Sequence, residues 1–216
     1  MTRRPKLGLL GGTFDPIHHG HLATARAAQH ALGLDAVWFV PSARPPHRPD
    51  SPQASEYHRV AMIRLAIAEG AGWEVCDLEL RREGASYTYD TLMTLNDGRP
   101  PSQIFFITGA DAFAEITTWH RYPDVLDLAH FVVVARPGFS IDALRQRVPA
   151  LATRMIEPVD LAVSSPPRII LVQAETPDVS STAIRGRVAG RCSLMGLVPP
   201  AVSAYISQHD LYSSGH

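Results

Sequence analysis

The stretch from Leu7 to His21 constrains the fold more than any other part of the chain. It begins with a short apolar run, continues through Gly11-Gly12 and ends in a histidine-rich segment. An apolar run that stops at glycines and is followed by a helical pattern is typical of a strand, a turn and a helix start. Glycines let a phosphate approach the backbone, and a helix N-terminus offers unpaired N–H groups. The stretch therefore predicts an α/β fold with an anion site after its first strand.

Further apolar runs alternate with helical segments along the rest of the chain. Strands are expected at residues 6–10, 35–41, 73–80, 104–108, 130–135 and 168–172, and helices at 19–32, 55–69 and 86–96. Most of these apolar runs are continuous, as in strands that are buried on both faces of a parallel sheet. We predict one α/β domain over residues 1–216, with a doubly wound, mainly parallel sheet, helices on both faces and a C-terminal helical part at about 180–212.

Three segments of the chain carry further predictions. The helix at 55–69 has Ser55 as its N-cap and an apolar stripe of Val60, Ile63, Leu65 and Ile67, which predicts its buried face. Residues 42–52 contain four prolines and are expected to form a loop. Residues 149–167 carry the weakest pattern and are expected to be a surface excursion.

Charge and cysteine content limit the class of protein. With 20 Lys and Arg against 21 Asp and Glu, the formal net charge is −1, so no general positive field attracts nucleic acid or an anionic membrane. No apolar run approaches the ~20 residues of a membrane span. Cys76 and Cys192 are far apart and are expected to be reduced structural thiols. We expect a soluble, cytoplasmic protein that binds neither nucleic acid nor membranes.

The histidines after the glycine turn suggest phosphate chemistry. His18 and His21 are three positions apart, so they share one face of the first helical turn, where a neutral imidazole can donate an N–H to a phosphate oxygen. A metal is the alternative, but no carboxylate or cysteine completes a usual ligand set, so no metal site is predicted. The glycines match neither G-x-G-x-x-G nor the P-loop, and alone they do not identify a nucleotide.

A second hydroxyl-rich segment lies near the other end of the chain. Ser180-Ser181-Thr182 follows a predicted strand and opens a predicted helix, with Arg185 one turn further on. Taken alone, it could be an ordinary helix cap with a solvated arginine. Ligands of parallel sheets bind outside the carboxyl ends of the strands. The junctions after Leu10, Thr108 and Val172 are therefore expected to converge on one site.

Both motifs together resemble those of the nucleotidylyltransferase superfamily, whose fold is of the Rossmann-like nucleotidyltransferase type. The matching residues are Gly11-Gly12-Thr13-Phe14-Asp15-Pro16-x-His18-x-Gly20-His21 and Ser180-Ser181-Thr182-x-Ile184-Arg185. Within it, the chain resembles the bacterial nicotinate-nucleotide adenylyltransferases over nearly its whole length. That narrower resemblance rests on Pro41–Arg48, Ser86–Leu92, Gly109-Ala110-Asp111, Trp119, Ala135–Gly138 and the tail from Leu197 to Tyr212.

The resemblance implies two sets of binding residues. ATP would contact Gly11, Gly12, Thr13, Phe14, His18, His21, Gly109, Asp111, Ser181, Thr182 and Arg185. The nicotinate mononucleotide would contact His47, Arg48, Tyr87, Thr88, Trp119 and Arg136. Trp119 could instead be a core or rim aromatic, Asp111 a helix cap, and Tyr87 a packing residue. The family usually has lysine where this chain has Arg48, which keeps the charge but changes the geometry of its contacts.

The implied reaction is transfer of the adenylyl group of ATP to nicotinate mononucleotide, giving the dinucleotide and pyrophosphate in NAD biosynthesis. His18, His21 and Arg185 would be the catalytic residues, with Mg²⁺ held mainly by substrate phosphates. Two alternatives stay open: another acceptor, such as nicotinamide mononucleotide or phosphopantetheine, and a non-catalytic nucleotide-binding module. The sequence also leaves open whether the chain forms a homo-oligomer.

Overall fold

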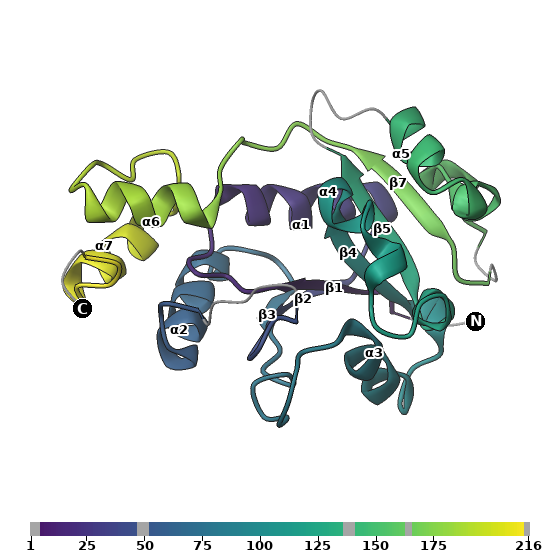
Figure 1. The fold of residues 1–216 in the computed structure, drawn as a ribbon, viewed down its shortest axis with the longest axis horizontal. Coiled ribbons are helices and arrows are strands. Elements are labelled where there is room, and N and C mark those ends of the chain that lie inside the picture. Colours follow the sequence, from purple (N-terminus) through teal and green to yellow (C-terminus); the bar gives the residue numbers. More distant parts are fainter. Residues whose placement is uncertain (1–4, 47–51, 136–140, 163–165, 214–216) are drawn as a thin grey trace.

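A seven-stranded, all-parallel sheet forms the centre of the computed structural model, which describes residues 5–46, 52–135, 141–162 and 166–213 (Figure 1). Its strand order is β3-β2-β1-β4-β5-β7-β6. The strands are β1 (Leu7–Gly12), β2 (Ala36–Pro41), β3 (Trp73–Val75), β4 (Ile104–Gly109), β5 (His130–Ala135), β6 (Met155–Ile156) and β7 (Ile169–Gln173). The predicted doubly wound parallel sheet of Rossmann-like type is confirmed.

Helices cover both faces of this sheet. They are α1 (His19–Leu32), α2 (Glu56–Ile67), α3 (Thr88–Asn96), α4 (Ala110–Phe113), α5 (Ile141–Arg147), α6 (Ser181–Ala189) and α7 (Pro200–Gln208). Figure 1 shows α1 and α3 on opposite sides of the sheet, and α6 and α7 together at one end, near α2. The C-terminal helix α7 packs against α2. The end of the chain thus returns to the segment that follows β2.

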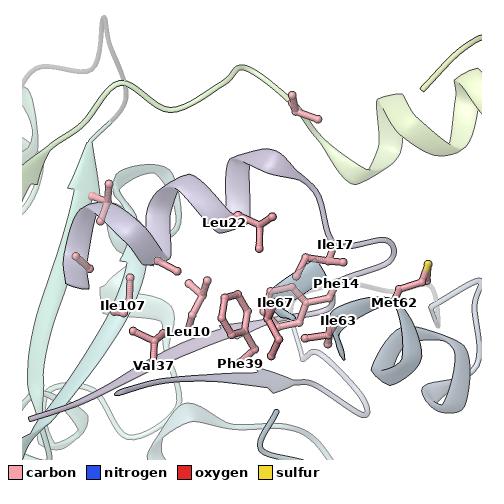
Figure 2. Packing of buried hydrophobic residues seen from close by; sticks show 14 of the residues in the cluster. Leu10, Phe14, Ile17, Leu22, Val37, Phe39, Met62, Ile63, Ile67 and Ile107 are labelled. Carbon is pink, nitrogen blue, oxygen red and sulfur yellow. The ribbon is translucent and has the colours of Figure 1, made fainter. Parts of the chain in front are cut away.

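Two hydrophobic cores, one on each face, account for the continuous apolar runs. Along β1, Leu9 belongs to the core under α3, whereas its neighbour Leu10 belongs to the core under α1. The same alternation holds in β4, where Phe106 and Ile107 face opposite cores. Figure 2 shows Leu10 and Ile107 beneath α1. Because side chains alternate between faces, a strand covered on both sides must be apolar at every position.

Two predictions about where strands lie were wrong. The strand expected at 73–80 ends at Val75, because the chain then turns at residues 77–80, where the N–H of Leu80 donates to the carbonyl of Asp77 at 3.0 Å. Residues 149–167 are not only a surface excursion, since they contain β6, which pairs in parallel with β7. Its residue Met155 is buried in the core under α3. A two-residue strand is too short to leave a periodic pattern in the sequence.

The predicted buried face of α2 was wrong in part. Ser55 caps this helix as expected, accepting from the N–H of His58 at 3.4 Å. Ile63 and Ile67 are buried, but Leu65 is 39% exposed, and Arg59 is buried instead. The reason is that the guanidinium of Arg59 reaches inward to two backbone carbonyls near the sheet.

Both cysteines have free thiols, Cys76 half-buried and Cys192 exposed, so burial does not support the expected structural role for Cys192. Within the described ranges, no helix has the length and apolar character that a membrane crossing requires.

Candidate active site

A cavity of about 470 Å³ opens at the carboxyl ends of β1 and β4. These neighbouring strands lie where the strand order reverses direction, which is the usual ligand position in open α/β sheets. The three predicted junctions do converge here. The cavity wall contains Gly11, Gly12, Thr13, Phe14, His18 and His21 from the first junction, Thr108, Gly109 and Asp111 from the second, and Thr176, Ser180 and Ser181 from the third.

The two glycines at the end of β1 leave room for aromatic rings beside the cavity. A Cβ atom on Gly12 would lie 3.1 Å from the ring of Phe14, and one on Gly11 would lie 3.3 Å from the ring of Phe106. Both distances are tighter than ordinary contacts, so a side chain would have to displace an aromatic ring or the backbone. The glycines therefore allow Phe14 and Phe106, which both line the cavity, to pack closely against this strand.

His18 and His21 form a stacked pair at the start of α1. Their ring centroids are 3.7 Å apart with an interplanar angle of 23°, so the predicted shared face is confirmed. The backbone N–H of His18 donates to Nδ1 of His21 at 3.3 Å. Because Nδ1 acts as an acceptor, the neutral ring of His21 carries its proton on Nε2. Gly20 permits this arrangement, since a Cβ there would lie 3.0 Å from the His18 ring.

Asp15 ties the loop between β1 and α1 to distant parts of the chain. Its carboxylate is buried and accepts from the N–H of Gln53 at 2.9 Å and of Ala54 at 3.1 Å. Its backbone carbonyl accepts from Nη1 of Arg185 at 2.8 Å. The Ser181 hydroxyl donates to the carbonyl of Pro16, the residue after Asp15, at 2.9 Å. The glycine-histidine motif and the helix α6 motif are therefore joined by direct hydrogen bonds.

Arg59 supports the same loop from the core side. Its Nη1 donates to the carbonyls of Thr13 at 2.7 Å and of Ser42 at 2.8 Å, and so holds the loops after β1 and β2 together. Burial lowers the pKa of Arg59, while the nearby carboxylate of Asp15 opposes that shift. Sequence reasoning missed this arginine, because its position on α2 matched an ordinary amphipathic helix.

Not all of the residues predicted to bind ATP lie in the cavity wall. Ser181 does, but Thr182 and Arg185 are not among the lining residues. Instead, Nη2 of Arg185 donates to the hydroxyl of Thr182 at 3.2 Å, and the arginine side chain is 18% exposed. In this structure Arg185 lies beside the cavity, held against the loop.

Aromatic residues also form part of the cavity wall. Tyr87, Thr88 and Trp119 line the cavity, and Trp119 packs edge-on against Phe106 with centroids 6.0 Å apart. The ring of Tyr87 stacks on that of His120 at 4.2 Å. His120 and the buried Glu79 also line the cavity and were missed, because neither belongs to a recognisable motif. His47, Arg48 and Arg136 lie outside the described residues.

Comparison with known proteins shows which protein family the sequence of this chain resembles. The model of the cytidylyltransferase-like family matches residues 9–187. The chain is 42% identical to a probable nicotinate-nucleotide adenylyltransferase of Trichlorobacter lovleyi, covering 96% of this chain and 99% of the relative. It is also 42% identical to one of Roseiflexus sp., covering 98% of this chain and 100% of the relative.

A solved structure has a similar fold. It is the nicotinic acid mononucleotide adenylyltransferase of Plasmodium falciparum complexed with NaAD, with a TM-score of 0.76 at 19% identity, covering 97% of this chain and 98% of that one. At this level of identity, the likeness supports the fold alone.

Proposed function

Because the chain belongs to the cytidylyltransferase-like family and, within it, to the nicotinate-nucleotide adenylyltransferases, we propose that it transfers the adenylyl group of ATP to nicotinate mononucleotide. The products are nicotinate adenine dinucleotide and pyrophosphate. The observation that carries this proposal is the single cavity that joins the stacked His18 and His21 to Tyr87, Thr88 and Trp119. The histidines offer donors for phosphate, and the aromatic residues offer a surface for a pyridine ring. We place this reaction of NAD biosynthesis in the cytoplasm.

The chemistry needs alignment more than proton transfer. The phosphate of the mononucleotide is ionised at neutral pH, so its oxygen can attack the α-phosphorus of ATP without a general base. A bond forms between that oxygen and the α-phosphorus as the bond to the bridging oxygen of the pyrophosphate breaks. In-line geometry and charge stabilisation then supply most of the rate enhancement. The reaction proceeds with no covalent enzyme intermediate.

The groups beside the glycine turn suit this role. The Nε2–H of His21 can donate to a phosphate oxygen, because its Nδ1 is occupied by the backbone N–H of His18. The N-terminus of α1 adds the positive end of the helix dipole next to both rings. Arg185 is held 2.8 Å from the backbone of the same loop and would add positive charge near the leaving pyrophosphate. Together these groups stabilise charge that develops during transfer.

The donor set fits a magnesium ion that is held mainly by substrate phosphates and water. Asp111 is a carboxylate in the cavity wall at the end of β4, and no three His, Cys, Asp or Glu side chains of the described ranges gather into a metal cage. Mg²⁺ usually keeps several waters and takes one or two protein carboxylates. When bound, it would neutralise phosphate charge.

The two substrates divide the cavity between them. We assign ATP to Gly11, Gly12, Thr13, Phe14, His18, His21, Gly109, Asp111 and Ser181, with Thr182 and Arg185 beside them. We assign nicotinate mononucleotide to Tyr87, Thr88 and Trp119, and propose that His47, Arg48 and Arg136 also contact it.

Pyrophosphate release tests the proposal. The purified chain would receive ATP and Mg²⁺ with nicotinate mononucleotide, nicotinamide mononucleotide or phosphopantetheine in separate reactions. We expect release with nicotinate mononucleotide at the highest kcat/KM. A higher kcat/KM with another acceptor would mean that this acceptor is the second substrate in place of nicotinate mononucleotide. No pyrophosphate release with any of the three acceptors would favour a non-catalytic nucleotide-binding module.

A further inference from the structure

A buried carboxyl group lies in the cavity wall near Tyr87, which we assign to nicotinate mononucleotide. Glu79 is 7% exposed and belongs to the turn after β3. The chemistry proposed above does not use it. Burial raises the pKa of this carboxyl group, while hydrogen bonds from Thr91 and Ser86 favour its ionised form. Burying a carboxyl group is costly unless hydrogen bonds compensate, so its contacts indicate what it does.

The first contact runs through Ser86 to the loop after β2. The hydroxyl oxygen of Ser86 accepts from the N–H groups of Ala43 at 2.9 Å and Arg44 at 3.2 Å. The backbone N–H of Ser86 also donates to the carbonyl of Arg44 at 2.9 Å. A serine hydroxyl has two acceptor lone pairs and one proton. Both lone pairs serve the loop, which leaves the proton available to Glu79, whose pKa Ser86 lowers.

The second contact runs through Thr91 to the first turns of α3. The hydroxyl of Thr91 donates to Oε1 of Glu79 at 2.7 Å. Its oxygen accepts in turn from Nη2 of Arg82 at 3.3 Å, and the same Nη2 donates to the carbonyl of Tyr87 at 3.5 Å. The carboxylate thereby connects the loop after β2 to the start of α3.

Both connected segments form part of the cavity wall. Pro45 and Pro46 line it from the loop, and Tyr87 and Thr88 line it from the start of α3. We propose that Glu79 is a positioning residue, which sets the spacing between these two segments and thereby the affinity for nicotinate mononucleotide. This inference rests on the function proposed above. Glu79 acts through Ser86 and Thr91 and does not touch the reacting phosphate.

A competing electrostatic role predicts the opposite result. Nicotinate mononucleotide is an anion, so a carboxylate that merely repelled it would weaken binding. Replacing Glu79 by glutamine removes the charge and leaves only one side-chain oxygen to accept hydroxyl protons. The KM for the mononucleotide should rise if Glu79 positions the wall, and fall if its charge only repels the substrate. The sign of the change therefore separates the two roles.

Steady-state kinetics of pyrophosphate release would test the inference. We expect Glu79→Gln to raise the KM for nicotinate mononucleotide by about tenfold, as loss of one charge-assisted hydrogen bond would do. The KM for ATP should change by less than about twofold, since the predicted ATP residues lie outside this hydrogen-bond network. Ser86→Ala should show the same split because it releases the loop. Glu83→Gln is the matched control, in an exposed residue four positions further along the chain.

Each outcome decides the inference. An unchanged or lower KM for the mononucleotide in Glu79→Gln would overturn it, and so would an equal rise for both substrates. Should Glu79→Gln fail to fold by circular dichroism, Thr91→Val carries the same test, because it removes the hydroxyl that donates to Oε1 of Glu79. If the unmodified protein is active while both variants match it, only the inference fails. If the unmodified protein releases no pyrophosphate with nicotinate mononucleotide, the proposed function fails and the inference falls with it.

Discussion

The hydroxyl of Tyr212 donates a 2.7 Å hydrogen bond to Oδ1 of Asp15, although 197 positions separate the two residues. Burial and the neighbouring carboxylate both raise the pKa of Tyr212, so it remains a hydrogen-bond donor at any physiological pH. The backbone carbonyl of Asp15 also accepts a hydrogen bond from Nη1 of Arg185. Through this contact the end of α7 and the tail support the loop that carries the glycine-histidine motif.

Tyr212→Phe should lower the free energy of unfolding by about 1.5–3 kcal/mol, because it removes a half-buried donor to the carboxylate of Asp15. Urea denaturation would measure this change. Tyr57→Phe is the control, since Tyr57 is 74% exposed, and it should stay within about 0.5 kcal/mol of the unmodified protein. Equal stability of the two variants would mean that the tail does not support the loop.

His21→Ala should reduce kcat by about 10²- to 10³-fold, because it removes a donor to the transferring phosphate. It also removes the acceptor for the N–H of His18, so His21→Asn is a necessary companion. The Asn oxygen lies near the position of Nδ1 and preserves that cap, but its side chain is too short to replace Nε2–H. We expect both variants to fold and to lose activity alike.

The exposed His30, at the other end of α1, provides the control His30→Ala, which should keep full activity. Activity retained in His21→Asn would reduce the role of His21 to capping α1.

Gly72→Ala should destabilise the protein by about 2–3 kcal/mol without touching the cavity. Gly72 has a φ of 72°, and a Cβ there would lie 2.6 Å from the carbonyl oxygen of Asp35. Its own carbonyl accepts from the N–H of Val37, so the strain would fall on the pairing of β2 with β3. Thermal unfolding would measure the loss. Gly98→Ala, where no atom lies within 4 Å of the added Cβ, should be nearly neutral.

The sequence predicted the features that local patterns encode. Glycines after β1 mark a turn, and the spacing of His18 and His21 marks a shared helical face, so both were predicted without knowledge of the fold. Arg59, Glu79 and Tyr212 were assigned no role, because their partners come from other segments and only the folded chain brings them together. A buried arginine or glutamate leaves no periodic signal, and its function depends on which distant carbonyl or hydroxyl group it meets.

Acidic pH should weaken the fold through His130, which lies at the start of β5. The residue is 2% exposed, its ring stacks on Phe105, and its Nδ1 accepts from the N–H of Arg168 at 3.1 Å. Burial, with the charges of Lys6 and Arg168, lowers the pKa of His130 from 6.5 to about 4. Between these values, the unfolded chain binds a proton that the folded protein does not, so stability falls as pH falls from about 6.5 to about 4. The loss should approach about 3 kcal/mol at pH 4, after the contribution of other groups is subtracted.

Urea denaturation at several pH values would measure this loss of stability. His130→Asn keeps an acceptor near Nδ1 but does not titrate, and its stability should fall less steeply over the same range. Parallel pH profiles for the two proteins would mean that His130 does not cause the loss.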